Sequence, residues 1–213
     1  IERLNSQGYH SRAVELLRQK TVTKKIFGFK DPRVAKLLPF WKEVFGYCHF
    51  EVNYVLALRH PFSVVKSLAK RDDLKAEHGY LLWLVHVIES LKYSQGSMRI
   101  VVDYDRLMQS PDAELLRVSK CLGLEIDYAA LQNYKTQFLD QDLRHTVFEL
   151  NDLLLDDACP PIVHEVYAAL LDVASDAATL DDKALQSKES RWADELVRLK
   201  SLFLLADRRY TQK

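Results

Sequence analysis

The run Tyr54–Leu58 (YVLAL) limits the folds open to this chain more than any other feature, because it is apolar without alternation. A half-exposed strand alternates apolar and polar residues, whereas a strand covered on both faces of a parallel sheet does not. Pro61 follows where the first residue of a helix belongs, and we expect that helix to run to about Lys70. Ile100–Val102 is a second short apolar run of this kind. The pattern therefore indicates buried parallel strands joined by helices.

Further elements fit the same architecture. Ile26, Phe27 and Phe29 predict a short strand that stops at the turn Lys30–Pro32, since proline cannot donate to a ladder. Strands separated by helices predict an α/β fold in three layers, a parallel sheet flanked by helices, with a helix-rich C-terminal half. The other expected helices are Ala13–Leu17, Val34–Phe45, Tyr80–Tyr93, a helix capped at Ser110 and stopped at Gly123, and Ile162–Ala174.

The length of 213 residues corresponds to one domain, or to one domain with an appendage. We expect the α/β domain to cover residues 1–174. The Asp-rich stretch 175–190 predicts a polar linker, and residues 191–213 predict an amphipathic helix. That helix could dock on the domain or mediate formation of an oligomer. Its apolar face consists of Leu196, Leu199, Leu202 and Phe203.

Composition excludes some classes of protein. Thirty basic and thirty acidic residues give a net charge of zero, which argues against coating nucleic acid or an anionic membrane but leaves room for a local basic pocket. Cys48, Cys121 and Cys159 are widely spaced, so we expect no disulfide framework or structural zinc, and a reducing, cytoplasmic location. The longest apolar stretch, Leu81–Ile88, is too short to span a bilayer.

The most informative segment lies where the first buried strand meets its helix. Arg59 stands at the carboxyl end of the strand, where open α/β sheets bind their ligands. The helix starting at Pro61 offers an N-terminus that favours an anion. Ser67 lies roughly 9 Å along that helix, and Ser63 is one turn before it on the same face. We predict a phosphate site here. The alternative is an ordinary strand–helix junction with a solvated arginine.

Lys30, Asp31 and Arg33 end the predicted preceding strand at the same edge of the sheet. Two cations and a carboxylate suit charge stabilisation and proton transfer at an anionic reacting centre.

Three motifs follow one another in this chain: F-K-D-P-R from Phe29, strand-R-x-P-x-x-x-x-x-S at Arg59, and Y-D-x-L at Tyr104. Their order resembles the sulfotransferases that use 3′-phosphoadenosine 5′-phosphosulfate (PAPS), and the K-D-P-R edge is similar to the bacterial branch. The resemblance is specific from about Phe27 to Leu124. It implies a P-loop NTPase-like sulfotransferase fold and transfer of a sulfuryl group from PAPS, without a metal, to a hydroxyl or amine acceptor, with carbohydrates among the candidates.

The resemblance also implies roles for individual residues. Arg59 and Ser67, joined by Ser63, would bind the donor's 3′-phosphate. Lys30, Asp31 and Arg33 would lie near the sulfuryl group and the acceptor, with Lys30 stabilising charge and Asp31 accepting the proton. Arg144 and His145, in the loop Leu143–Thr146, are further candidate donor contacts, and the alternative is an ordinary exposed loop.

One part of the family pattern is absent from the sequence. The glycine-rich loop that cradles the 5′-phosphosulfate has no counterpart in Ile1–Lys25. We expect that loop, and so the start of the domain, to lie upstream of Ile1. The alternative is a degenerate relative that serves as a non-catalytic interaction module and makes contacts through the C-terminal helix.

Other signals are weaker. Asp103 and Asp105 mimic the D-x-D of metal-dependent glycosyltransferases, although solvated strand-end acids are the simpler interpretation. His86 and Glu89 lie one turn apart on an expected buried helix, and without a third ligand we interpret His86 as a core histidine.

Overall fold

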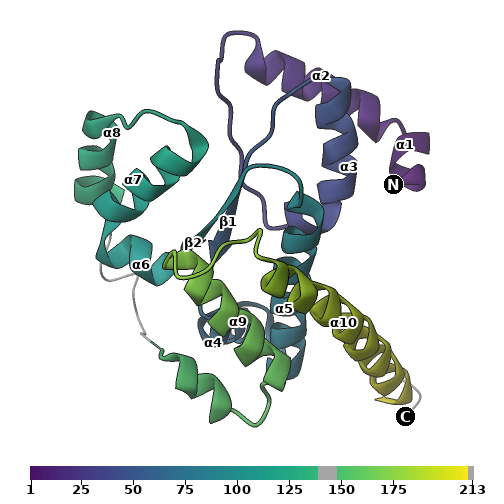
Figure 1. Cartoon of the computed structure of the whole chain (residues 1–213). Coiled ribbons are helices and arrows are strands. Elements are labelled where there is room, and N and C mark those ends of the chain that lie inside the picture. Colours follow the sequence, from purple (N-terminus) through teal and green to yellow (C-terminus); the bar gives the residue numbers. More distant parts are fainter. Residues whose placement is uncertain (139–147, 211–213) are drawn as a thin grey trace.

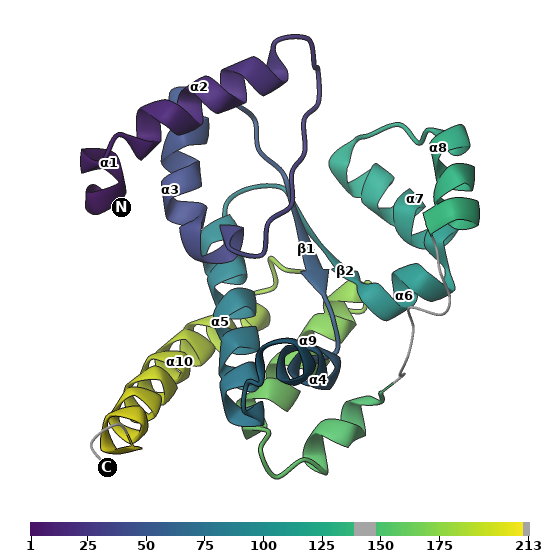
Figure 2. The same cartoon turned by 180° about the vertical axis from the view of Figure 1, so that it is seen from behind.

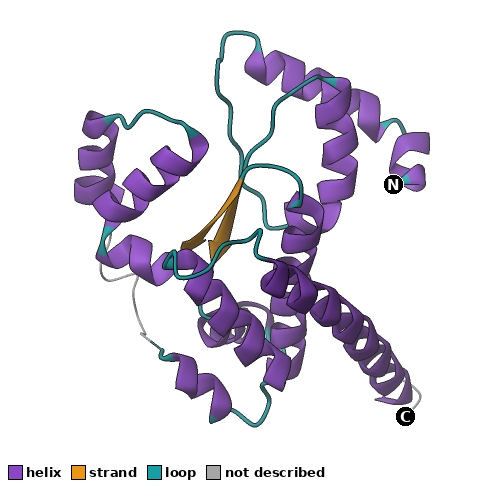
Figure 3. Ribbon diagram, in the orientation of Figure 1, coloured by secondary structure: helices purple, strands orange, loops and turns teal. Residues whose placement is uncertain are grey.

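The computed structural model describes residues 1–138 and 148–210. The protein is α/β and mostly helical, with a small parallel sheet of two strands at its centre (Figures 1 and 3). Strands β1 (Tyr54–Leu58) and β2 (Arg99–Asp103) pair in register, from Tyr54 opposite Arg99 to Leu58 opposite Asp103. The two parallel strands expected from the apolar runs are therefore confirmed.

Helices α4 (Pro61–Asp72) and α5 (Ala76–Ser94) form the crossover that a parallel pair of strands requires. Pro61 occupies the first turn of α4, as expected, because its missing N–H costs nothing there. The two helices approach closely at Gly79, where an added Cβ would lie 3.0 Å from Val65 Cγ2. This close packing explains why a glycine is accepted inside a long helix.

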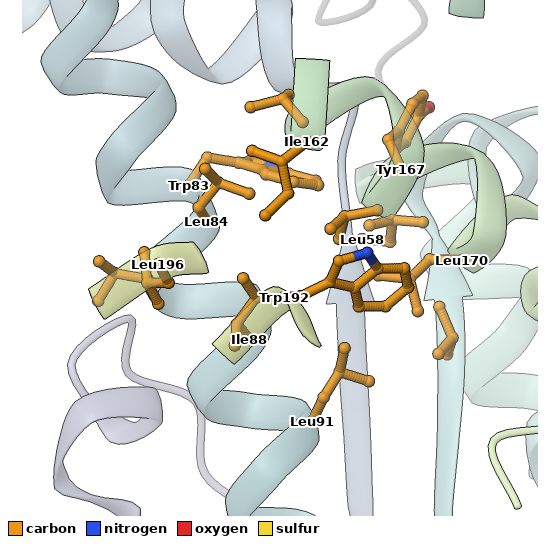
Figure 4. Packing of buried hydrophobic residues seen from close by; sticks show 14 of the residues in the cluster. Leu58, Trp83, Leu84, Ile88, Leu91, Ile162, Tyr167, Leu170, Trp192 and Leu196 are labelled. Atoms are coloured by element: carbon orange, nitrogen blue, oxygen red, sulfur yellow. The ribbon is translucent and has the colours of Figure 1, made fainter. Parts of the chain in front are cut away.

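The main core lies between the sheet and four helices: α4, α5, α9 (Pro161–Ala174) and α10 (Lys183–Tyr210). Trp192 of α10 is fully buried and lies among apolar side chains of α5 and α9, including Ile88, Leu91 and Leu170 (Figure 4). Fully burying such side chains contributes roughly 1.5–3 kcal/mol each, so α10 is an integral part of the domain.

This packing corrects the predicted linker at 175–190 and the predicted helix start at Arg191. Helix α10 begins at Lys183, and Leu180 and Leu185 are buried in the main core. The segment is also tied to the sheet, because Arg99 Nη2 donates to the Leu180 carbonyl oxygen at 2.9 Å. The polar composition of the segment reflects its exposed side. Residues 211–213 of the predicted helix lie outside the described residues.

Three N-terminal helices build a second, smaller cluster. They are α1 (Glu2–Ser6), α2 (Tyr9–Thr21) and α3 (Val34–Tyr47), and they lie at one end of the molecule (Figures 1 and 2). The buried members of this cluster are Ala13, Val14, Leu17, Phe40, Val44 and Phe45.

The predicted strand at Ile26–Phe29 is wrong: this segment is an irregular connection between α2 and α3. A strand needs a neighbour for its backbone hydrogen bonds, and the aromatic side chains find partners on a helix instead. The Phe29 ring lies 5.3 Å from the Trp41 ring of α3. Within the described residues the sheet therefore has two strands, and no three-layer sheet is seen. One face of β1 is also open, since Val55 is 51% exposed.

The remaining elements follow β2 in the chain. Helix α7 (Pro111–Leu122) begins with Pro111 and is followed by Gly123, whose φ of 64° is left-handed, both as expected. The Ser110 side chain makes no capping hydrogen bond. None of the described helices is long and apolar enough to cross a bilayer. The other elements are α6 (Tyr104–Gln109), α8 (Tyr128–Asn133), a π-helical turn η1 (Tyr134–Phe138) and a 3₁₀ helix η3 (Leu150–Leu154).

Candidate functional site

The carboxyl ends of β1 and β2 bring Arg59 and Tyr104 together. Leu58 lies opposite Asp103 in the register, so the next residue of each strand leaves the sheet at the same edge. The guanidinium carbon of Arg59 lies 4.9 Å from the centroid of the Tyr104 ring, a cation–π contact. The Arg59 side chain is exposed, and none of the ion pairs or hydrogen bonds within the described residues involves its guanidinium. Its donors are therefore available to an anion.

His60 fixes the entry of the chain into α4. Its Nδ1 accepts a hydrogen bond from the Phe62 backbone N–H at 3.2 Å, which leaves Nε2 to donate to the Glu149 carbonyl oxygen at 3.1 Å. The ring is fully buried against Tyr167, with ring centroids 4.9 Å apart. Burial lowers the pKa of His60, so the imidazole is neutral at pH 7. His60 is thus a helix cap.

This cap reduces what the start of α4 can offer an anion. Pro61 has no N–H, Phe62 donates to His60, and Val64 donates to the His60 carbonyl oxygen. The Ser63 N–H has no partner among the described residues. Together with the positive end of the helix dipole, it leaves one backbone donor for an anion.

The two serines of α4 that were predicted to bind phosphate lie at the surface, near the junction of β1 and α4. Ser63 is half-buried and Ser67 is exposed, and neither hydroxyl makes a hydrogen bond within the described residues. The adjacent Lys66 points elsewhere, because its Nζ lies 4.4 Å from the Phe62 ring centroid and 4.6 Å from that of Phe148. No contact within the described residues joins Arg59 to either serine.

Lys30, Asp31 and Arg33 form a separate cluster at the start of α3. Asp31 Oδ1 accepts from the Arg33 backbone N–H and from Nε, each at 2.8 Å, and Oδ2 accepts from Nη2 at 2.5 Å. These hydrogen bonds hold the pKa of Asp31 well below its usual range. A carboxylate that binds protons so weakly is a poor general base, which weighs against the proton-accepting role predicted for Asp31.

The Lys30 side chain is exposed next to this ion pair. No hydrogen bond or ion pair within the described part of the chain connects Lys30, Asp31 or Arg33 to Arg59. The structure therefore presents two charged groups of residues rather than one.

Asp103, the last residue of β2, has a structural role. Asp103 is 2% exposed, its Oδ1 accepts from the Arg106 N–H at 3.0 Å, and burial raises its pKa. Asp103 is therefore the N-cap of α6. This weakens the D-x-D interpretation, and in the described ranges no three His, Cys, Asp or Glu side chains converge as metal ligands. His86 is likewise engaged, since its Nδ1 lies 2.7 Å from the Leu82 carbonyl oxygen.

Arg144 and His145, the two predicted donor contacts, lie outside the described residues. Sequence reasoning missed the capping role of His60 and the contact between Arg59 and Tyr104. Both depend on which segments meet at the end of the sheet. The position of His60 directly before Pro61 was the only local signal for a cap.

Comparison of the chain with protein-family models, with curated proteins and with solved structures finds no match.

Proposed function

We propose that this chain is a PAPS-dependent sulfotransferase, an enzyme that moves a sulfuryl group from PAPS to a hydroxyl or amine acceptor. The observation that supports the proposal best is the exposed Arg59 at the carboxyl edge of the sheet, without a carboxylate partner among the described residues. An unpaired guanidinium beside a helix N-terminus is suited to a phosphate group. The proposal includes the three-layer sulfotransferase sheet, of which β1 and β2 are two strands.

The donor's 3′-phosphate is held at the start of α4 in this proposal. The guanidinium of Arg59 supplies two parallel donors, and Ser63 and Ser67 supply hydroxyls on the exposed side of the helix. Tyr104 holds the Arg59 side chain in place before the donor binds, which lowers the entropy cost of binding. Arg144 and His145 remain predicted contacts to the donor.

In the reaction itself, an acceptor oxygen or nitrogen attacks sulfur as the bond from sulfur to the donor's phosphate oxygen breaks. The acceptor loses its proton to a base, and adenosine 3′,5′-bisphosphate leaves with the bonding electrons. We assign charge stabilisation at the leaving oxygen to Lys30, with Arg33 nearby. Asp31 serves to hold Arg33, since its lowered pKa makes it a poor base.

Calorimetry with adenosine 3′,5′-bisphosphate tests the proposal, with 5′-AMP as the control ligand. We expect the bisphosphate to bind at least tenfold more tightly, which corresponds to about 1.4 kcal/mol for the 3′-phosphate. Arg59→Ala should weaken binding of the bisphosphate by about 2–4 kcal/mol, the size of a charge-assisted phosphate contact.

Arg12→Ala is the matched control, because Arg12 is also an exposed arginine that lies over a tyrosine ring, 5.5 Å from the centroid of Tyr9, but on α2. That variant should bind the bisphosphate like the unmodified chain. Normal binding by Arg59→Ala would remove the assignment. No binding of the bisphosphate at all would favour the non-catalytic interaction module.

A further inference from the structure

The connection between α2 and α3 exposes apolar side chains among lysines. We call residues 22–29 the basic–apolar loop. Val22 is 80% exposed and Ile26 is 68% exposed, and Phe27 adds an aromatic ring that is 41% exposed. Lys24 and Lys25 are exposed beside them, and no ion pair within the described residues involves either one. A compact group of this kind marks an interaction site more often than scattered single residues do.

A second exposed apolar group, around η3, carries the opposite charge. We call residues 148–157 together with Phe62 the acidic–apolar surface. Leu154 is 64% exposed and Leu155 is 82% exposed. Four acidic residues accompany them in the sequence: Glu149, Asp152, Asp156 and Asp157.

The acidic–apolar surface also contains a cavity of about 580 Å³. Its walls are apolar at Phe62, Phe148 and Leu155, and acidic at Asp152 and Asp156. The Nζ of Lys66 covers the two rings, 4.4 Å and 4.6 Å from their centroids, so the carboxylates of the cavity are what attracts a further cation. The apolar walls and the carboxylates together suit an apolar anchor with a lysine beside it.

The two surfaces lie at opposite ends of the molecule. In both views the basic–apolar loop begins at the top, at the end of α2, and descends toward the sheet, whereas η3 lies at the bottom (Figures 1 and 2). They cannot meet within one chain. They are nevertheless complementary in charge, and each presents exposed apolar side chains. The zero net charge of the chain removes the repulsion that would otherwise oppose association of two copies.

We infer that a second copy of this chain docks its basic–apolar loop on the acidic–apolar surface of the first. Ile26 and Phe27 of one copy pack into the cavity beside the paired rings of Phe62 and Phe148 of the other, and Lys24 and Lys25 meet the carboxylates at its rim. One such contact uses a different surface on each copy, so each copy of the pair has one surface left. These two remaining surfaces either meet each other, which closes a dimer, or bind further copies.

Helix α10 is the competing surface for self-association. It too exposes apolar side chains, with Val197 at 64% and Leu204 at 61%. Asp194 and Arg198, which are close to Val197 on the helix, carry opposite charges, so the surface around Val197 has no net charge for a second surface of the chain to complement. Its variant is therefore the matched control.

Sedimentation velocity over a range of concentrations tests the inference on the full chain. We expect the average mass to rise with concentration for the unmodified protein. Ile26→Ser/Phe27→Ser and Leu154→Ser/Leu155→Ser should each remain monomeric, while Val197→Ser/Leu204→Ser should associate like the unmodified protein. All six positions are exposed, and circular dichroism verifies that each variant is folded. Raising the ionic strength from about 0.1 M to about 1 M should weaken association, because the Debye length falls from about 10 Å to about 3 Å.

Mixing the two monomeric variants gives the decisive measurement. Each variant retains the surface that the other has lost, so an equimolar mixture should form dimers and no larger assembly. A mixture that stays monomeric would overturn the inference, as would a monomeric unmodified protein or dissociation by the α10 variant. Donor binding is a separate measurement, so failure of this inference leaves the proposed function untouched.

Discussion

At the residue scale, Asp103 combines a favourable cap with an unfavourable buried charge. Its Oδ1 caps α6, whereas its Oδ2 has no hydrogen-bond partner in the described part of the chain. Burial raises the pKa of Asp103 above its ordinary value of 3.8, so the folded state binds the proton more tightly than the unfolded state. The stabilising contribution is therefore complete at low pH and is lost as the pH rises above that ordinary value.

Two substitutions separate these effects. Asp103→Asn keeps an oxygen for the cap and removes the charge, so we expect it to be at least as stable as the unmodified protein at pH 7. The difference should close toward about pH 4, where the native carboxyl is protonated. Asp103→Ala should cost about 1 kcal/mol by loss of the cap. Urea unfolding at several pH values measures both, and an Asn variant as unstable as the Ala variant would contradict this account.

Asp31 shows the opposite shift, and its cause can be removed. In Arg33→Gln, we expect the pKa of Asp31 to return toward 3.8, because the bidentate guanidinium that lowers it is gone. Carboxyl ¹³C NMR titration follows the change. Asp72, whose pKa is lowered by Arg71, is an internal reference that should not move. A persistently low pKa of Asp31 would show that Arg33 is not responsible.

The sequence identified some site residues better than others, for a physical reason. The position of Arg59 at the end of β1 could be predicted because strand and helix boundaries are local in the chain. The contact of Arg59 with Tyr104, which is far along the chain, could not. The ion pair between Asp31 and Arg33 is local, but its effect on the pKa depends on a side-chain geometry that no pattern of residues reveals.

At the scale of elements, α10 is the helix that differs most between the prediction from the sequence and the structure. Trp192 is fully buried in the main core, whereas Leu202 on the same helix is 62% exposed. We expect Trp192→Ala to destabilise the domain by about 3–5 kcal/mol through loss of packing. Leu202→Ala should stay within about 0.5 kcal/mol. Urea unfolding followed by circular dichroism compares the two. Equal, small effects would mean that α10 contributes little to the stability of the domain.

The elements that were predicted well are those whose signal is local. The apolar runs of β1 and β2, the proline at the start of α4 and the glycine at the end of α7 each determine a boundary by themselves. The segment Ile26–Phe29 has the composition of a strand, but a strand exists only when another pairs with it. Residues 183–190 are helical but read as a linker, because a helix with a narrow buried stripe is mostly polar. Residues 175–182 do connect two helices, but Leu180 among them is buried in the main core. In both cases the missing information was a partner distant in the sequence.

At the scale of the whole molecule, the main core and the smaller cluster stabilise different parts of the chain, and to different extents. The main core joins both strands to α4, α5, α9 and α10. The smaller cluster joins α2 to α3, with α1 attached through Leu4, at the far end of the molecule (Figure 1). Because few buried residues hold α1 and α2, these helices should open more easily than the main core.

Native-state hydrogen exchange with one leucine removed from each cluster measures this difference. Leu17 is 4% exposed in the smaller cluster, and Leu170 is 2% exposed in the main core. Leu17→Ala should cost about 2 kcal/mol or more locally, and so speed exchange in α1 and α2 by roughly 30-fold while leaving β2 and α9 unchanged. Leu170→Ala should speed exchange in every element, since global unfolding then becomes easier. If Leu17→Ala accelerates β2 and α9 equally, the two clusters unfold as one cooperative unit, and α1 and α2 are as firmly held as the sheet.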